Sequence, residues 1–300
     1  MRGRDLMIPE SAQTSDSITD YLKARRLLFE QELVQQLEPS RSGLERAMAY
    51  TLLLPSKRIR PLFCLEVCQS LLGRSEEAMP AAMALEFVHS YSLIHDDLPA
   101  MDDDELRRGQ PTNHRVFGEA RAILAGDALL TKAFEILAMC GQLADGLRVS
   151  LIKTLSSAAG DQGMVLGQDM DLDAKLKDIR ELHLKKTGEL LAASFVMGAI
   201  SAGASQRMLE DFREIGLSLG LVFQIWDDVL DVEGGSQIGK PLGSDEKNQK
   251  RTFVRDMGLE AAKLEARKIL NETILKLRSL ELKFENRLEE MAYYILERRH

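Results

Sequence analysis

The feature that most constrains the fold of this chain is the distribution of its prolines. All eight lie at positions 9, 39, 55, 61, 80, 99, 111 and 241, so 129 consecutive residues (112 to 240) contain none. Proline removes a backbone donor and breaks helix interiors, so a long run without it favours several long helices. The chain is rich in Ala, Leu, Met, Glu and Lys, and aromatic residues make up only 5%. The sequence therefore predicts an all-α fold.

Hydrophobic periodicity and helix start and stop signals predict about ten helices. The first is expected to begin at Ser17, where Asp20 forms a variant of the capping box, and to stop before Pro39. The others are expected at about 41–54, 57–73, 76–97, 118–140, 145–168, 176–203, 206–232, 258–279 and 284–298.

The chain contains no run of residues alternating at period two and no short internal repeat. One helical domain over residues 17–300, preceded by a disordered arm over residues 1–16, is therefore the economical interpretation. Residues 233–251 are rich in Gly, Ser and Lys and are expected to form a long surface loop. Loops of that length are often functional.

Composition limits the functional classes. The 300 residues are 45% hydrophobic and 29% charged, which is typical of a globular protein with a large core. The net charge of −8 lacks the basic footprint of a nucleic-acid binder. An acidic protein can still bind an anion, but it then needs a local basic cluster or a metal ion.

Neither a membrane span nor a secretory signal is predicted. The N-terminus has no apolar core segment, and the most apolar stretch, around residues 120–140, is interrupted by Asp127, Lys132 and Glu135. The three cysteines, Cys64, Cys68 and Cys140, are an odd number without framework spacing. They are expected to be buried thiols in a reducing compartment, which favours a cytoplasmic or stromal protein.

Two acidic clusters dominate the candidate chemistry, HDDLPAMDDD at 95–104 and DDVLD at 227–231. Asp227 and Asp231 lie four residues apart, so they share a helix face about 6 Å apart along the axis. Pro99 is expected to end the first helix near Asp97, where the helix dipole disfavours bare carboxylates. The negative charge of both clusters is electrostatically unfavourable unless cations bind them. Oxygen ligands of this kind favour Mg²⁺ or Mn²⁺.

Basic residues recur at defined places relative to these clusters. Lys57 to Arg60 open one expected helix, Arg107 and Arg108 follow the first acidic cluster, and Lys186 lies within another helix. Metal carboxylates beside an arginine pair are suited to a diphosphate, which Mg²⁺ bridges and Arg binds bidentately. Neither a phosphate-binding P-loop nor a dinucleotide-binding glycine motif is present in the sequence.

Four motifs together resemble the short-chain trans-prenyl diphosphate synthases. They are LIHDDLPAMDDDELRRGQPTNHRVFGEARAILAGDALL (93–130), KTGELL (186–191), GLVFQIWDDVLD (220–231) and GKPLGSDEKNQK (239–250). The resemblance extends over roughly residues 45 to 298. It is strongest to bacterial-type farnesyl diphosphate synthases, which carry two extra residues inside the first motif. It implies about ten core helices around a deep central cavity, and a homodimer.

The resemblance also implies roles for individual residues. Two aspartate sets would hold Mg²⁺, three ions per site with substrate bound: Asp96, Asp97 and Asp102, and Asp227, Asp228 and Asp231. The allylic diphosphate would be bound by Arg107, Lys186, Lys240 and Lys250. Isopentenyl diphosphate would be bound by Lys57, Arg60, His89 and Arg108. Thr187 and Gln224 would direct oxygen dipoles at the developing allylic cation.

One stretch departs from the family pattern. Where the family normally has Gly-Gly before the lysine, this chain has Pro55 and Ser56. Pro55 lacks an N–H, and Ser56 adds a side chain where a diphosphate would approach closely. The departure bears on the affinity for isopentenyl diphosphate.

The implied function is Mg²⁺-dependent condensation of isopentenyl diphosphate with dimethylallyl or geranyl diphosphate to give farnesyl diphosphate. The same chemistry could instead stop at geranylgeranyl or geranyl diphosphate. A terpene cyclase would share the fold and the acidic clusters but lack the isopentenyl-binding residues. A non-catalytic regulatory subunit usually loses aspartates, and all six are present here.

Product length is expected to depend on Tyr91, with the small Ser92 beside it. Tyr91 lies five positions before Asp96, which places it about 7.5 Å further along the helix. A growing chain that hangs from the metal-bound diphosphate would meet this ring. The sequence therefore predicts a C15 product, with a plain core role for Tyr91 as the alternative.

Overall fold

The computed structural model describes residues 17–37, 42–173, 178–233 and 252–297, and its first two helices begin at capping side chains. The Ser17 hydroxyl accepts a hydrogen bond from the Asp20 N–H at 3.2 Å, at the start of α1 (Ile18–Gln35). Ser42 and Glu45 form a reciprocal capping box at the start of α2 (Gly43–Leu52). Both pairs satisfy backbone donors that a helix start leaves without partners.

Helices make up most of the described residues and strands only four of them, which confirms the all-α prediction. The elements after α2 are α3 (Ile59–Leu72), the 3₁₀ turn η2 (Glu76–Ala78), α4 (Met79–Asp96), β1 (Leu106–Arg107), β2 (Gln110–Pro111), α5 (Asn113–Phe117), α6 (Glu119–Ala138), α7 (Asp145–Ala159), α8 (Met164–Asp171), α9 (Ile179–His183), the π-helical turn η3 (Leu184–Gly188), α10 (Glu189–Ser201), α11 (Gln206–Glu233), α13 (Phe253–Met257), α14 (Leu259–Arg278) and α15 (Leu288–Glu297). Ten of the helices in the described ranges are ten residues or longer, in line with the expected ten.

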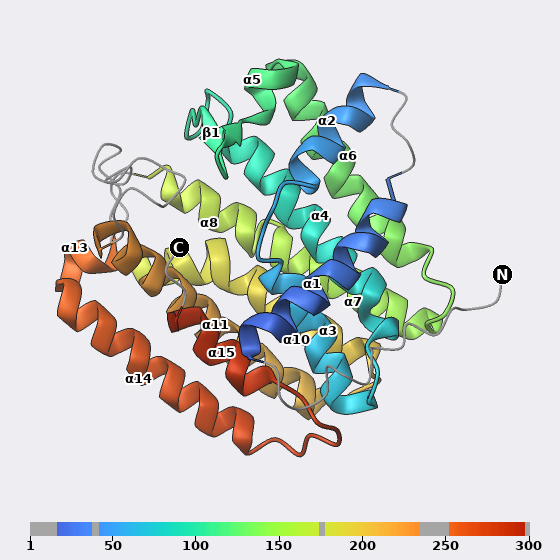
Figure 1. Ribbon diagram of the computed structural model, residues 1–300, viewed down its shortest axis with the longest axis vertical. Helices are drawn as coiled ribbons and strands as arrows, with labels where there is room; N and C mark the ends of the chain where they lie inside the picture. Colours follow the sequence, from blue (N-terminus) through green and yellow to red (C-terminus); the bar gives the residue numbers. More distant parts are fainter. Residues whose placement is uncertain (1–16, 38–41, 174–177, 234–251, 298–300) are drawn as a thin grey trace.

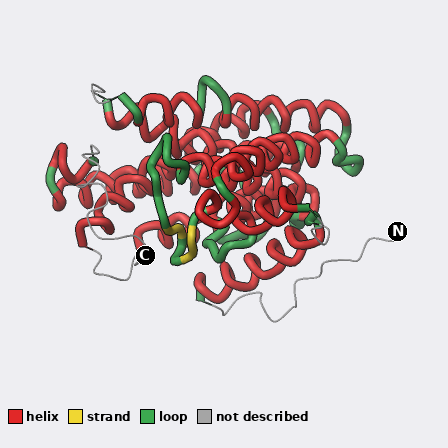
Figure 2. The backbone as a smooth tube through the Cα atoms, turned by 90° about the horizontal axis from the view of Figure 1, so that it is seen from above, coloured by secondary structure: helices red, strands yellow, loops and turns green. Residues whose placement is uncertain are grey.

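The long helices pack around α4 and α10. Helix α4 packs mainly on α6, and α10 packs on α11, α3 and α7. In Figure 1, α14 lies along one edge of the molecule, whereas α2, α5 and α6 lie toward the opposite edge. Figure 2 shows the β1–β2 hairpin, in yellow, as a small feature beside the helices. None of the described helices is long and apolar enough to cross a membrane.

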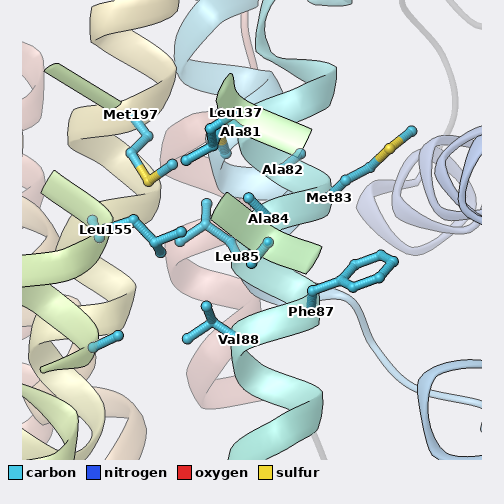
Figure 3. Packing of buried hydrophobic residues seen from close by; sticks show 14 of the residues in the cluster. Ala81, Ala82, Met83, Ala84, Leu85, Phe87, Val88, Leu137, Leu155 and Met197 are labelled. Carbon is cyan, nitrogen blue, oxygen red and sulfur yellow. The ribbon is translucent and has the colours of Figure 1, made fainter. Parts of the chain in front are cut away.

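The main hydrophobic core surrounds α4, whose interior is apolar on nearly every side. In Figure 3, Leu85 points toward Leu155 of α7, whereas Phe87 and Met83 point to the other side of the helix. A helix that is apolar all round belongs in the centre of a large protein. Helix α4 thus holds a fixed position, and its C-terminal end carries the first acidic cluster.

Two parts of the predicted helix pattern were wrong. The single helix expected at 145–168 is divided into α7 and α8. Between them Gly160 is extended (φ −84°, ψ −156°), and the Gly163 N–H donates to the Gly160 carbonyl at 3.0 Å. The helix expected at 176–203 contains the π-helical turn η3, which hydrophobic periodicity does not reveal. The arm at 1–16 and most of the loop at 233–251 lie outside the described residues.

Close approach of α11 to η3 depends on a glycine, and this generates a stability prediction. A Cβ added at Gly220 would lie 2.6 Å from the Gly188 Cα, so Gly220→Ala should force the two elements apart. We expect it to lower the free energy of unfolding by about 1–3 kcal/mol, as overpacking does. Urea unfolding followed by circular dichroism measures the change.

Gly146→Ala is the matched control for this substitution. Gly146 lies in α7, where no described atom comes within 4 Å of an added Cβ. Because alanine is the better helix former, the control should hold or raise the stability. Equal loss of stability in both variants would contradict the packing argument.

Candidate active site

The first acidic cluster lies where α4 ends. Asp97 caps the helix, which stops at Asp96, two residues before the position that Pro99 disfavours for helix. The chain then turns back on itself, because the Asp102 N–H donates to the Asp96 carbonyl at 2.9 Å. Asp102 is thereby held beside the end of α4.

Arg107 is held against this cluster by the β1–β2 hairpin. Its Nε lies 2.7 and 2.9 Å from the two carboxylate oxygens of Asp97, and its Nη2 lies 3.4 Å from Asp104. Asp97 is only 1% exposed, so this is a buried, charge-assisted pair. Arg107 therefore supplies part of the positive charge that the cluster requires.

Asp96 shows the electrostatic strain of the cluster. Burial raises the pKa of its carboxyl to about 6, and the nearby Lys186 opposes this rise. The charges of Asp102 and Asp97 raise the pKa further. An added cation would stabilise the ionised form of such a group.

The second cluster belongs to α11 and is tied to two other elements. The Asp228 carboxylate, 4% exposed, accepts the Phe253 N–H at 2.7 Å and the Gln224 amide at 3.2 Å. The Thr187 hydroxyl donates to the Gln224 Oε1 at 3.2 Å. Thr187, Gln224 and Asp228 therefore form one hydrogen-bonded line, which joins η3 to the second acidic cluster.

Lys186 is directed by the π-helical turn η3. Its Nζ lies 2.6 Å from the Asp171 Oδ2 of α8. The backbones of α8 and η3 are in close contact, since a Cβ added at Gly167 would lie 2.1 Å from the backbone nitrogen of Lys186. The charge of Lys186 also acts to lower the pKa of Asp96 in the first cluster. The pairing with Asp171 was not anticipated from the sequence.

A cavity of about 580 Å³ brings together the four residues that the resemblance assigns to isopentenyl diphosphate. Lys57, Arg60, His89 and Arg108 all line it, and so does Asp227 of the second cluster. The other lining residues are Arg26, Pro55, Ser56, Arg58, Ile59, Glu86, Phe223 and Tyr294. Residues from well-separated parts of the chain therefore meet there.

The cavity has a strongly positive electrostatic environment. Burial lowers the pKa of Arg60, and Glu86 and Asp227 oppose the shift. Burial also lowers the pKa of Arg108 to about 10. Burial and the charges of four nearby arginines lower the pKa of His89 well below its ordinary value, which favours the neutral imidazole. Such a cavity favours a compact dianion.

Arg58 and Glu86 organise the cavity, and the sequence did not mark either as special. Arg58 is 3% exposed and donates to Glu86 at 2.5 Å, to Glu30 at 3.2 Å and to the carbonyls of Leu52 and Leu54. It adopts a left-handed conformation (φ 51°) immediately before α3. The one available signal for Glu86 was a carboxylate within an otherwise apolar helix.

The structure does not bring every predicted residue into one cluster. Within the described ranges, no three His, Cys, Asp or Glu side chains converge as a metal site. Mg²⁺ commonly completes its shell with water and substrate phosphates, so the six aspartates still suit it chemically. Lys240 and Lys250 lie outside the described residues.

Tyr91 and Ser92 lie on α4 near the first cluster. Tyr91 is buried in the main core, with its ring edge-on to His95 at 5.7 Å. Burial and the charge of Asp96 raise the pKa of Tyr91 to about 12. The Ser92 hydroxyl donates to the His89 carbonyl at 2.9 Å. These contacts leave both a packing role and a role in product length open for Tyr91.

His183, one residue before η3, generates a pH prediction. Burial lowers its pKa from 6.5 to about 4, the charge of Asp171 opposes this, and neither ring nitrogen has a hydrogen-bond partner among the described residues. Between these two values the unfolded state binds more protons than the folded state, so stability falls as the pH falls from 6.5 to 4. The full contribution is about 3 kcal/mol.

We expect His183→Gln to reduce this loss of stability. Unfolding by urea at pH 8 and at pH 5 gives the change for each protein, and the comparison between pH values cancels any packing effect of the substitution. An equal loss of stability in wild type and variant would show that His183 does not charge on unfolding.

Comparison with known proteins identifies the family of the chain. The polyprenyl synthetase family profile matches residues 41–291. The chain is 44% identical over 277 residues to a farnesyl diphosphate synthase of Micrococcus luteus, covering 90% of this chain and 94% of the relative. It is 41% identical over 266 residues to geranylgeranyl pyrophosphate synthase 7, chloroplastic, of Arabidopsis thaliana, covering 86% and 77%.

Solved structures agree with this assignment. A Helicobacter pylori geranyltransferase complexed with magnesium and isoprenyl diphosphate superposes with a TM-score of 0.78 at 32% identity, covering 95% of this chain and 97% of that one. The residues matched by the family profile include both acidic clusters and most of the cationic cavity. The chain belongs to the polyprenyl synthetase family.

Proposed function

We propose that this protein is a Mg²⁺-dependent prenyltransferase that joins isopentenyl diphosphate head-to-tail to dimethylallyl and geranyl diphosphates, with farnesyl diphosphate as the product. The observation that carries the proposal is the cavity shared by Lys57, Arg60, Arg108 and Asp227. A cationic diphosphate site thus adjoins a carboxylate of the second acidic cluster. Farnesyl diphosphate synthases among the relatives support the reaction and its C15 product.

The six aspartates of the two clusters would hold Mg²⁺, with three ions per site once substrate is bound. They are Asp96, Asp97, Asp102, Asp227, Asp228 and Asp231. They offer only hard oxygen donors, and the raised pKa of Asp96 reflects a site that a cation would stabilise. When bound, Mg²⁺ neutralises the allylic diphosphate, which is otherwise a poor leaving group.

The basic residues would divide between the two substrates. The allylic diphosphate would be bound by Arg107, Lys186, Lys240 and Lys250. In the structure Arg107 pairs with Asp97 and Lys186 pairs with Asp171. On substrate binding, each would redirect some of these hydrogen bonds to the diphosphate. Lys57, Arg60, His89 and Arg108 would hold isopentenyl diphosphate. A neutral His89 can still donate one hydrogen bond to a phosphate oxygen.

The line of Thr187 and Gln224 suits the cationic intermediate. Loss of diphosphate leaves an allylic cation, and fixed dipoles stabilise such charge best when they are already oriented. The Thr187–Gln224 hydrogen bond and the Gln224–Asp228 hydrogen bond provide that orientation. The isopentenyl double bond would attack the cation, and the departing diphosphate would accept the proton that is then lost.

A homodimer in the cytoplasm is part of the proposal. Val116 of α5 and Ile123 and Leu124 of α6 are exposed apolar side chains that a second copy would cover. The three cysteines are free and buried, which fits a reducing compartment. Analytical ultracentrifugation of the full chain gives the stoichiometry, and a purely monomeric protein would contradict the dimer.

Metal dependence tests the proposed function directly. We expect diphosphate release from the two substrates to stop in excess chelator and to return with Mg²⁺. Asp96→Ala and Asp227→Ala should each lower kcat at least about 10²-fold, the scale of removing one key electrostatic stabiliser. Glu272→Ala, which removes an exposed carboxylate from α14, is the control. Undiminished turnover in chelator would refute the proposal.

Product length tests the role of Tyr91. We expect the wild type to make C15 and Tyr91→Ala to make C20 or longer, because the substitution removes a ring that lies about 7.5 Å along α4 from Asp96. Tyr91→Phe keeps the ring and should keep C15. Chromatography of the dephosphorylated products measures the outcome.

Two results would remove Tyr91 from this role. If the wild type already makes C20, as the geranylgeranyl synthases among the relatives do by name, Tyr91 does not stop elongation. If the alanine variant still stops at C15, the ring is a core residue only.

A further inference from the structure

Arg26 and Ser56 line the cationic cavity but have no role in the function proposed above. Arg26 lies on α1, outside the residues matched by the family profile, and Ser56 takes the place of a family glycine. The guanidinium of Arg26 reaches across to the turn before α3, where its Nη1 lies 3.4 Å from the Ser56 carbonyl oxygen. Phe29 and Leu33, fully buried in the main core, fix α1 in this position.

Both side chains present buried polar atoms that are unused. The Arg26 Nε, the Ser56 Oγ and the Arg60 Nε are all shielded from solvent and have no hydrogen-bond partner among the described residues. All three residues line the same cavity. Buried polar groups in native proteins are nearly always paired, so three unsatisfied groups around one cavity indicate a ligand rich in acceptors.

The charges indicate that this ligand is an anion. Arg26, Arg60 and Arg108 line the cavity, and none of them forms an ion pair within the described part of the chain. Arg58, beside them, is paired with Glu86 and Glu30 and serves as an internal comparison. Three half-buried arginines outnumber the two carboxylates of the cavity, Glu86 and Asp227, and this excess of positive charge is unfavourable unless a bound anion offsets it.

The walls of the cavity indicate what is attached to the anion. Phe223 of α11, Tyr294 of α15 and Ile59 of α3 line it together with the arginines. An apolar wall beside three arginines suits a diphosphate that carries a short hydrocarbon. Isopentenyl diphosphate has that chemistry, whereas inorganic diphosphate has only the charged half.

We propose that Arg26 and Ser56 are substrate-binding residues for the diphosphate of isopentenyl diphosphate, and that they take over the role of the Gly-Gly pair that the family normally has at this turn. The inference rests on the proposed function. Arg26 would donate two hydrogen bonds from its guanidinium, and it lies on a helix outside the family profile. Ser56 would donate a hydrogen bond from its hydroxyl, where the family glycine has no side chain. The replacement of Gly-Gly by Pro55 and Ser56 would then preserve binding of the same diphosphate through different contacts.

Steady-state kinetics of Arg26→Gln tests the role of Arg26. We expect KM for isopentenyl diphosphate to rise about 10- to 100-fold, the range for removing a charge-assisted hydrogen bond, with KM for geranyl diphosphate changed less than about twofold. Arg26→Lys keeps the charge but not the planar fork, so its KM should lie between the two. Lys23→Ala removes an exposed cation from the same helix and is the matched control, with unchanged KM.

Ser56→Ala tests the second residue. We expect a rise in KM for isopentenyl diphosphate of about 3- to 10-fold, the range for removing one ordinary hydrogen bond. If both side chains bind one diphosphate, the effects in the double variant should not be additive. Thermal unfolding of each variant checks that it folds. If Arg26→Gln unfolds at a lower temperature than the wild type, the role of Arg26 is tested instead with Arg26→Lys, by calorimetric measurement of its binding of isopentenyl diphosphate.

The outcomes separate this inference from the proposed function. A wild type that releases no diphosphate from isopentenyl and geranyl diphosphates overturns the function itself. A wild type with normal turnover, together with unchanged KM in Arg26→Gln and Ser56→Ala, overturns only the assignment of these two residues. If these variants raised KM equally for isopentenyl and geranyl diphosphates, the assignment would also be overturned, because the two residues would then not be specific to isopentenyl diphosphate.

Discussion

The site depends on keeping charges of opposite sign buried close together without letting them neutralise each other fully. Arg60 and Arg108 line a cavity in which Glu86 and Asp227 are the internal countercharges, and the Glu86 carboxylate is already bound by Arg58. Across the site, Asp96 carries a raised pKa even though Lys186 is near. Each side therefore retains affinity for an ion of opposite sign, a diphosphate on one side and a metal cation on the other.

Helix α4 makes this arrangement possible because one rigid element carries both signs. Glu86 and His89 lie within it at the cationic cavity, and Asp96 lies at its C-terminal end. Apolar packing on nearly every side of α4 fixes the distance between these groups, because close-packed interiors transmit strain and do not yield easily. A substitution deep in the core can therefore alter the geometry of the site.

Irregular backbone supplies the remaining precision. The π-helical turn η3 directs Lys186 toward α8 and Thr187 toward Gln224, although the two residues are adjacent in sequence. The β1–β2 hairpin directs Arg107 at Asp97, while Arg108, with φ 54°, turns into the cationic cavity. Neighbouring side chains can point to different parts of the site here because the chain departs from regular helix.

Local signals in the sequence determined the class of fold and the chemical parts. The proline-free run, the capping groups at Ser17 and the two aspartate clusters can be recognised in the chain without a structure. Only the tertiary structure decided which residues share a cavity. It separated the structural Arg58 from Arg60, paired Lys186 with Asp171, and brought Arg26 from α1 to Ser56. These contacts join residues 15 to 30 positions apart through packing of whole helices, and no local pattern of residue types encodes the direction in which a buried arginine points.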